Sequence, residues 1–352
     1  MAKVIQVGLG FWGYDWATTV LPTVDTVEVV GYVDGDEEAR NRITSAHDAP
    51  KAPAFPTLRA ALDAVDADVV LGTLRTEAHY PVVREALEAG KHVIVEKPFT
   101  ATMTEAHDLV SLADEQRRIL MVSQNYRFYP APILAAELVA KQAVGHVGLV
   151  DIEFRQYAPG IGYRYWDFPD PLLADMSIHH FDLMRMVLAD EPKSVSCRTW
   201  NLPGSPFANH PVGVVTIEFA GGTIVSYRGS WMSGGGPTPW AGEWTIDCDG
   251  GEIWFTARGS GAERLLKDRV ILRKRGEEAV EPPLPQLRHS DRAGTIAAMA
   301  DAVRSGVMPP RFSSGRDNLM SLALVQASIL STQRGGDWVT IEEILSGPRA
   351  VR

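Results

Sequence analysis

The fold is decided by Val4-Ile5-Gln6-Val7-Gly8-Leu9-Gly10-Phe11-Trp12-Gly13, near the start of a 352-residue sequence. The first four residues form a short apolar run, typical of a strand buried in a parallel sheet. The glycines follow with G-x-G-x-x-G spacing, and the segment after them is compatible with a helix. Asp34 ends the next predicted strand, about 20 residues further on, where an acid can bind ribose hydroxyls. These features predict a dinucleotide site, with residues 8–13 against a pyrophosphate.

The residues that follow Asp34 favour NAD over NADP. Residues 35–38 add three carboxylates, so a ribose 2′-phosphate would meet a cluster of negative charge. Arg40 and Arg42 are near, but several residues into the predicted helix. An acid at this position selects a free 2′-hydroxyl. We therefore expect NAD as the cofactor, with NADP less favoured.

Strand-length apolar runs alternate with helical segments through the first third of the chain. The runs cover residues 4–7, 27–33, 69–74, 93–95 and 119–122, and the helical segments cover residues 37–46, 58–65, 80–89 and 104–117. Thr102 precedes Glu105 by the spacing of a capping box, which marks the start of a helix. This alternation predicts a parallel, doubly wound Rossmann domain over residues 1–124.

After Gln124 the strands become longer, and apolar and polar residues alternate along them. Hairpins are predicted near residues 215–227 and 245–255, each with a glycine turn. Helices are expected over residues 133–142, 172–188, 295–304 and 318–331, and residues 267–275 predict an exposed edge strand. Alternation of this kind favours an antiparallel sheet with one covered face. The chain is therefore α/β, with a second, α+β domain over residues 125–352.

The overall charge excludes several classes of partner. Asp and Glu (44) outnumber Lys and Arg (34), and the formal net charge is −10. Without a local basic patch, this balance argues against nucleic acid. No stretch approaches the roughly 18 apolar residues that cross a bilayer, so no membrane partner is expected. Cys197 and Cys248 are too few for a disulfide framework and fit a reducing, cytoplasmic location.

Two groups of residues could carry chemistry. Glu96-Lys97-Pro98 follows a predicted strand, and ligands of open α/β sheets bind beyond the carboxyl ends of strands. Lys97 is thus a candidate for the site, although it could also be a surface lysine. Asp175, His179 and Asp182 have i, i+4, i+7 spacing, which places them on one face of a helix.

Three interpretations of that face stay open on spacing alone. Asp175 and His179 could form a proton-transfer pair in a substrate cleft. Asp and His at helical spacing could also ligate zinc. In the simplest case, Asp175 caps the helix and His179 is an ordinary hydrogen-bonded histidine. His180 points about a third of a turn away and is expected to be structural.

Together, these residues resemble the GFO/IDH/MocA family, named for glucose–fructose oxidoreductase, inositol 2-dehydrogenase and rhizopine catabolism. Four features match in order: residues 4–13, residues 89–93 running into 96–98, residues 125–128, and Asp175-x-x-x-His179-x-x-Asp182. The resemblance covers the chain to residue 190; beyond that it rests on the order of elements.

The resemblance implies an N-terminal Rossmann domain followed by an α+β domain with a large, mostly antiparallel open sheet. It implies an NAD(P)-dependent oxidoreductase that oxidises a secondary alcohol of a sugar, sugar derivative or cyclitol. It also implies homodimers or homotetramers formed through the open sheet face. The family does not need a metal. In family members the bond that matches Lys97–Pro98 is often cis.

The resemblance carries three catalytic roles over to this chain. His179 would accept the hydroxyl proton, Asp175 would orient or charge it, and Lys97 would contact nicotinamide and substrate. Besides residues 8–13 and Asp34, the residues expected around the cofactor are Thr73, His79, Glu96, Lys97 and Asn125. Those expected around the substrate are Lys97, Arg127, Tyr163, Arg164, Trp166, Asp175 and His179.

One departure from the family bears on the substrate. Family members often carry glycines before the acid that matches Asp175, whereas residues 167–174 here are Asp-Phe-Pro-Asp-Pro-Leu-Leu-Ala. This stiffer approach predicts a reshaped pocket rim. Tyr163, Arg164 and Trp166 could stack on and hydrogen-bond a sugar, or simply pack a loop.

Two other activities occur on this fold. One is a lyase or glycoside hydrolase that retains NAD and works through transient oxidation of its substrate. The other is a non-catalytic, NAD-dependent sensor. The presence of Lys97, Asp175 and His179 together argues against the sensor.

Overall fold

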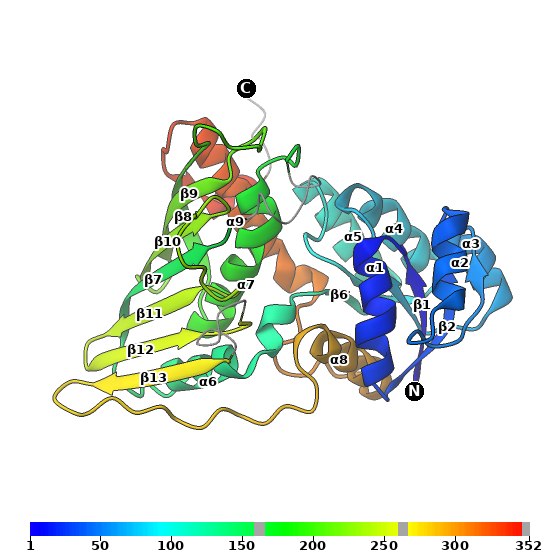
Figure 1. Ribbon diagram of the computed structural model, residues 1–352, viewed down its shortest axis with the longest axis horizontal. Coiled ribbons are helices and arrows are strands. Elements are labelled where there is room, and N and C mark those ends of the chain that lie inside the picture. The colour runs from blue at the N-terminus through cyan, green and yellow to red at the C-terminus, as the bar shows by residue number, and fades with distance from the viewer. Residues whose placement is uncertain (158–165, 260–266, 347–352) are drawn as a thin grey trace. The chain divides into compact units, whose positions relative to one another are not determined.

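The computed structural model describes residues 1–157, 166–259 and 267–346 (Figure 1). The chain divides into two compact units. The first unit comprises Met1–Asn125 and Arg288–Leu319, and the second comprises Tyr126–Leu287 and Met320–Arg352. Residues 288–319, which were expected in the second domain (residues 125–352), therefore belong to the first unit.

The first unit contains a parallel sheet of six strands in the order β3-β2-β1-β4-β5-β6. The strands are β1 (Ala2–Val7), β2 (Val27–Val33), β3 (Ala54–Phe55), β4 (Val69–Gly72), β5 (His92–Val95) and β6 (Leu120–Val122). The strand order reverses beside β1, and ligands of doubly wound sheets bind at this point. The predicted Rossmann sheet is confirmed. Only β3 was missed, because two residues are too few to form a hydrophobic pattern.

Helical segments connect these strands. They are α1 (Phe11–Asp15), the π-helical turn η1 (Trp16–Val20), η2 (Leu21–Thr23), α2 (Glu37–Ser45), α3 (Leu58–Ala64), η3 (Thr76–Ala78), α4 (His79–Glu88), α5 (Met103–Glu115) and α8 (Asp291–Ser305). The capping box that starts α5 is present: the Thr102 hydroxyl accepts from the Glu105 amide, and the Glu105 carboxylate accepts from the Thr102 amide. The box satisfies two amides that the first turn of a helix leaves without partners.

The second unit contains an eight-stranded sheet in the order β13-β12-β11-β7-β10-β9-β8-β14, in which only the β7–β10 pair is parallel. Its strands are β7 (Val147–Arg155), β8 (Pro192–Trp200), β9 (Val212–Phe219), β10 (Ile224–Ser230), β11 (Glu243–Cys248), β12 (Gly251–Thr256), β13 (Arg269–Lys274) and β14 (Val339–Thr340). Both predicted hairpins, β9–β10 and β11–β12, are confirmed, and β13 is an edge strand as expected.

Helices cover one face of this second sheet. The helical segments are η4 (Asn125–Phe128), α6 (Pro130–Ala140), η7 (Pro171–Ser177), α7 (Ile178–Leu188), α9 (Gly315–Gln333) and α10 (Ile341–Leu345). Figure 1 shows α6 and α7 on the same side of the sheet. Exposed and buried residues alternate along β7, β9 and β10, as expected when one face packs against helices.

The helix expected over residues 172–188 begins differently from the prediction. Pro171–Ser177 form a π-helical turn, preceded by Asp170 in a left-handed conformation (φ 45°), and the α-helix starts only at Ile178. Pro171 has no amide hydrogen to donate, and π-helical turns are often found at functional sites. Asp175 therefore lies in η7, whereas His179 lies in α7.

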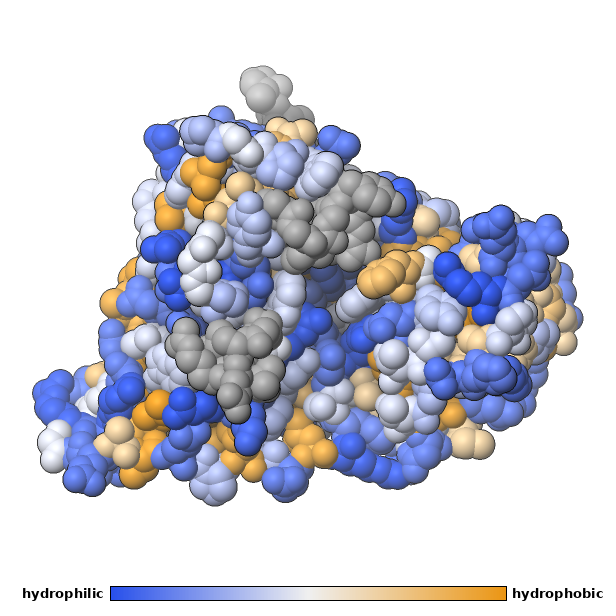
Figure 2. All heavy atoms as spheres, in the orientation of Figure 1, coloured by the Kyte–Doolittle hydropathy of each residue, from blue (hydrophilic) through white to orange (hydrophobic). Residues whose placement is uncertain are grey.

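No helix in the three described ranges is long and apolar enough to cross a membrane. Figure 2 shows a visible surface that is mostly hydrophilic, with apolar residues in small, separate groups. Phe11, in the glycine-rich turn, is among the large apolar side chains that are exposed (75%).

Arg292 shows why the segment 288–319 joins the first unit. Its Cζ lies 4.2 Å from the ring centroid of Trp12 and 5.5 Å from that of Trp16. One guanidinium nitrogen is 2.5 Å from the carboxylate of Asp15, and only 11% of the Arg292 side chain is exposed. A cation over indole rings gains more when it is shielded from water. Arg292 thus ties α8 to the helical segment that follows the glycine-rich turn.

We expect Arg292→Ala to lower the free energy of unfolding by about 1–3 kcal/mol, because it leaves Asp15 without its cation and removes the contacts with two indoles. Urea unfolding measures the loss. Arg304→Ala is the matched control on the same helix, since Arg304 forms an exposed pair with Asp301 and such pairs contribute little. Equal stability losses in the two variants would show that Arg292 is no anchor.

Candidate active site

The glycine-rich turn leaves open space at one of its three glycines. Gly8 has φ 94°, and a Cβ there would lie 2.9 Å from the Thr73 carbonyl oxygen. A Cβ on Gly13 would lie 1.9 Å from the Gly8 carbonyl oxygen, whereas a Cβ on Gly10 would meet no atom within 4 Å. Chain packing therefore requires glycine at positions 8 and 13. The space beside Gly10 fits the close approach of a dinucleotide phosphate.

Side chains from β1 and the end of β4 hold the turn from beneath. The Thr73 hydroxyl donates to the Gly8 carbonyl (2.6 Å) and accepts from the Gln6 amide nitrogen (3.1 Å). The same Gln6 nitrogen donates to the Gly13 carbonyl (2.7 Å). Both side chains are buried. Thr73, expected near the cofactor, therefore supports the glycine-rich turn from beneath.

Asp34 is held against the same turn. One carboxylate oxygen accepts from the Leu9 amide (2.6 Å) and the other from the Asp36 amide (2.9 Å). Arg40 and Arg42 donate to backbone carbonyls, Arg40 to Asp34 (2.8 Å) and Arg42 to Leu9 (2.5 Å). Each guanidinium thus makes a backbone contact close to Asp34.

The segment Glu96-Lys97-Pro98 is tied to its surroundings at the end of β5. The buried Glu96 carboxylate accepts from the Trp16 indole (2.8 Å) and from the Lys97 amide (3.2 Å). The peptide bond between Lys97 and Pro98 is cis, as the resemblance implied. Lys97 itself is half-buried.

His79 and Asn125 also contact protein groups of the first unit. The His79 ring lies between the carbonyls of Pro98 (2.9 Å from Nδ1) and Leu74 (3.2 Å from Nε2). Burial lowers the pKa of His79 from its ordinary value. The Asn125 amide donates to Asp291. Both side chains connect the strand ends to neighbouring segments.

In the second unit, His179 is buried on α7 with an aromatic ring beside it. The rings of His179 and Tyr126 are stacked, with centroids 4.3 Å apart and planes 10° apart. Asp175, in η7, is half-buried. The Trp231 indole donates to the carbonyl of Pro171, at the start of η7 (3.1 Å). The turn that carries Asp175 is thus held at its first residue.

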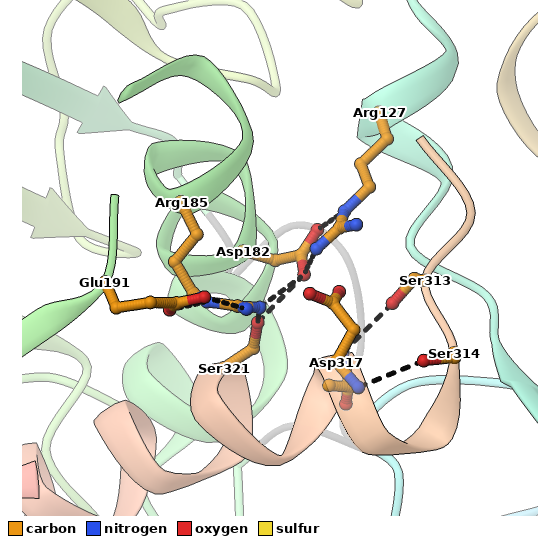
Figure 3. A network of polar contacts seen from close by, with 9 residues as sticks. Arg127, Asp182, Arg185, Glu191, Ser313, Ser314, Asp317 and Ser321 are labelled. Atoms are coloured by element: carbon orange, nitrogen blue, oxygen red, sulfur yellow. Dashed lines mark hydrogen bonds and ion pairs between the residues drawn. The ribbon is translucent and has the colours of Figure 1, made fainter. Parts of the chain in front are cut away.

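The third residue of the predicted face, Asp182, belongs to a buried ionic network (Figure 3). Arg127 donates to its carboxylate through two nitrogens, at 2.6 and 2.7 Å, and the Ser321 hydroxyl donates to it at 2.8 Å. Arg185, one helical turn on, binds Glu191 through two nitrogens (2.5 and 2.7 Å). Asp182 therefore anchors Arg127, which was expected to contact substrate.

His180 has hydrogen bonds that fix its tautomer. Nε2 lies 3.0 Å from the Trp240 carbonyl, which can only accept, so Nε2 carries the hydrogen. Nδ1 then accepts from the Tyr227 hydroxyl (3.1 Å), which itself accepts from Ser177 (3.0 Å). Burial lowers the pKa of His180 from 6.5 to about 4. The expectation that His180 is structural agrees with this chain of bonds.

Three residues expected around the substrate lie in or directly beside a segment that the structure does not describe. Tyr163 and Arg164 lie outside the described residues, and Trp166 is half-buried. Within the described ranges, no group of three or more His, Cys, Asp and Glu side chains is placed to hold a metal ion.

Two side chains around α7 and η7 were not predicted as functional candidates: Tyr227 and Arg258. Both lie far along the chain, where no local pattern marks them. Tyr126 and Trp231 did carry a signal, because Tyr126 lies inside the motif of residues 125–128 and Trp231 begins a loop, residues 231–244, that is expected to shape the substrate pocket.

The low pKa of His180 predicts a loss of stability in mild acid. Its folded-state pKa lies below the unfolded value, so its contribution is present above pH 6.5 and is lost as pH falls toward 4. Linkage gives a loss of about 2 kcal/mol between pH 7 and pH 5. Urea unfolding at both pH values should show this loss in the wild type and not in His180→Gln. His107→Gln, at an exposed position, is the control. Equal pH dependence in wild type and His180→Gln would refute the assignment.

Comparison with known proteins places the chain in a family. A model described as "Oxidoreductase family, NAD-binding Rossmann fold" matches residues 2–124, and one described as "GFO/IDH/MocA C-terminal domain" matches residues 133–254. The uncharacterised protein y4oX of Sinorhizobium fredii is 28% identical over 359 residues, covering 99% of this chain and 98% of its own. D-apiose dehydrogenase of Paraburkholderia graminis is 25% identical over 321 residues, covering 89% of this chain and 83% of its own.

A solved structure shares the fold. The crystal structure of an oxidoreductase from Agrobacterium radiobacter in complex with NAD+, L-tartaric acid and magnesium has a TM-score of 0.83 at 19% identity, and covers 97% of this chain and 98% of that chain. Both family models match in order and together span most of both units. The chain belongs to the GFO/IDH/MocA family of NAD-binding oxidoreductases.

Proposed function

We propose that this protein is an NAD-dependent dehydrogenase that oxidises a secondary alcohol of a sugar, sugar derivative or cyclitol. The observation that carries the proposal is His179, a buried imidazole stacked on Tyr126, four residues after Asp175 in a family of oxidoreductases. The similarity to a D-apiose dehydrogenase supports the substrate class. A histidine is suited to exchange protons with an alcohol near neutral pH.

We assign the chemical steps to three residues. NAD, held against residues 8–13 and Asp34, would supply a hydride acceptor for the alcohol carbon. His179 accepts the hydroxyl proton, and returns it in the reverse direction. Asp175 orients or charges His179, and the Lys97 ammonium hydrogen-bonds the reacting oxygen and stabilises the negative charge that develops on it.

The proposed preference for NAD rests on Asp34. Its two carboxylate oxygens are fixed by the amides of Leu9 and Asp36, so the negative charge cannot easily turn away from a ribose. A 2′-phosphate near this carboxylate would be repelled, whereas a 2′-hydroxyl can donate to it.

Replacing Asp34 should therefore relax the cofactor preference. In Asp34→Ala we expect the ratio of kcat/KM for NAD to that for NADP to fall on the order of tenfold or more, as one charged hydrogen bond is lost and one repulsion removed. Initial rates with each cofactor measure the ratio. Asp63→Ala, an exposed carboxylate on α3, is the control. A wild type that prefers NADP would refute the preference.

The proposed catalytic roles predict loss of turnover with retention of NAD. The assay combines the protein, NAD or NADP, and a panel of aldoses, ketoses, inositols and anhydrosugars, and follows reduced nicotinamide by its near-ultraviolet absorbance. Lys97→Ala and His179→Ala should each lower kcat by about 10²- to 10⁴-fold, while calorimetry still detects NAD binding. Lys141→Ala and His107→Ala, both at exposed positions, are the matched controls.

Two results would overturn these assignments. Near-normal turnover in Lys97→Ala or His179→Ala would remove that residue from the mechanism. A wild type that binds NAD but is silent across the panel would contradict the dehydrogenase. The lyase or hydrolase would then be tested by looking for product without net reduced nicotinamide.

We also propose a cytoplasmic homodimer or homotetramer. Burial raises the pKa of the free thiols Cys197 and Cys248 to about 11, which keeps them unreactive in a reducing compartment.

Leu149, Val214 and Ile224 are partly exposed on the second sheet, on the face that α6 and α7 do not cover. Apolar side chains exposed on an open sheet face favour contact with a second copy.

A further inference from the structure

We propose that Tyr126 is the positioning residue for His179, and that Arg258 holds Tyr126 in place. This inference rests on the proposed role of His179 as the proton acceptor. It assigns a function to Tyr126, which lies in the matching motif of residues 125–128 without a role of its own, and to Arg258, which no motif singles out. The contacts that carry it all lie within the second unit.

The first step is the stack between the two rings. Tyr126 and His179 lie parallel, with centroids 4.3 Å apart and planes 10° apart, and both side chains are buried. A flat ring in van der Waals contact with one face of an imidazole prevents the imidazole from tilting toward that side. The stack therefore restricts the directions in which the His179 nitrogens can point.

The second step is the anchor of Tyr126 itself. Arg258 donates from Nη1 to the Tyr126 hydroxyl (2.6 Å), and its Cζ lies 5.2 Å from the Tyr126 ring centroid. A charged donor on the phenol oxygen makes a stronger hydrogen bond than a neutral one. This bond fixes the far end of the ring whose face supports His179.

The third step is the backbone of Arg258, which is fixed on both sides. Its amide donates to the Asp268 carboxylate (3.0 Å), and its carbonyl accepts from the Trp240 amide (2.9 Å). The second oxygen of Asp268 accepts from the Ala131 amide at the start of α6 (3.2 Å). Arg258 is thus tied to the helix that begins just after Tyr126.

These contacts form a closed path that begins and ends on α7. The backbone amide of Trp240 donates to the Arg258 carbonyl, and the Trp240 carbonyl accepts from Nε2 of His180, the chain neighbour of His179. The path His179–Tyr126–Arg258–Trp240–His180 therefore begins and ends on adjacent residues. His179 is positioned through its ring on one side and through its backbone on the other.

The experiment combines a geometric readout with kinetics. Proton–carbon NMR of the nine histidine rings, with the His179 signal assigned from His179→Ala, reports the stack as an upfield ring-current shift. We expect Tyr126→Leu to abolish this shift and Tyr126→Phe to keep it. We also expect Tyr126→Leu to lower kcat about 10- to 100-fold, as a misplaced catalytic group does, with little change in KM. Tyr126→Phe keeps the stacked ring but loses the hydrogen bond from Arg258, so its kcat should lie between those of Tyr126→Leu and the wild type.

Arg258 is tested through a double-mutant cycle. Arg258→Met should lower kcat to about the level of Tyr126→Phe and have little further effect in Tyr126→Phe, because both changes remove the same hydrogen bond. Arg269→Met is the matched control: Arg269 also lies over an aromatic ring, that of Trp254, in the same unit, but on edge strand β13. Its kcat should equal that of the wild type.

Each outcome separates this inference from the proposed function. An active wild type whose His179 signal is unshifted, or an active Tyr126→Leu with normal kcat, overturns the positioning role and leaves the dehydrogenase intact. Additive effects of Arg258→Met and Tyr126→Phe overturn the role of Arg258. A wild type that shows no turnover with any substrate overturns the proposed function, and with it the catalytic role of the stack. The NMR shift still shows whether the two rings are stacked.

Discussion

The buried ion pair between Arg127 and Asp182 sets the geometry of the second unit around His179. Asp182 lies one turn of α7 beyond His179, and Arg127 follows Tyr126 in η4, so the pair locks η4 against α7. An ion pair buried to this extent is stable only if both partners are well satisfied. Here both carboxylate oxygens accept from Arg127, and Ser321 adds a third donor. The pair lies next to Tyr126 in η4 and one turn from His179 in α7, so it joins the two segments that carry the stacked rings.

In the first unit, side chains hold a tight backbone turn so that one side of it stays open to a ligand. The turn is packed from below, where Gln6 and Thr73 bind its carbonyls, and it is open at Gly10. Trp16, two turns of helix from Gly10, binds Glu96, and Arg292 covers Trp12 and Trp16. Polar side chains thus make a rigid support under a backbone that has no side chains of its own at positions 8, 10 and 13. Such rigidity lets backbone amides meet a pyrophosphate without reorganising.

The three buried histidines, His79, His179 and His180, lie in two kinds of surroundings. His79 and His180 are buried among carbonyls or hydroxyls, where desolvation lowers the pKa and keeps the rings neutral as structural connectors. His179 lies beside an aromatic face instead, although it is adjacent to His180 in the chain. Two neighbouring histidines on one helix therefore face different surroundings, because successive helical residues point about 100° apart.

The amino-acid sequence by itself determined the alternating strands and helices of the first unit, two hairpins of the second, the glycine turn and the acid at Asp34. Apolar runs, helix caps and glycine spacing are local patterns, and they did not predict the two-residue β3 or the strands β7, β8 and β14. Tertiary structure alone decided that residues 288–319 join the first unit, that Asp182 binds Arg127, and that Arg258 reaches Tyr126. It also decided that the helix carrying Asp175 begins as a π-helical turn. The physical reason is that these partners lie tens to hundreds of residues apart, so only the folded chain brings them together.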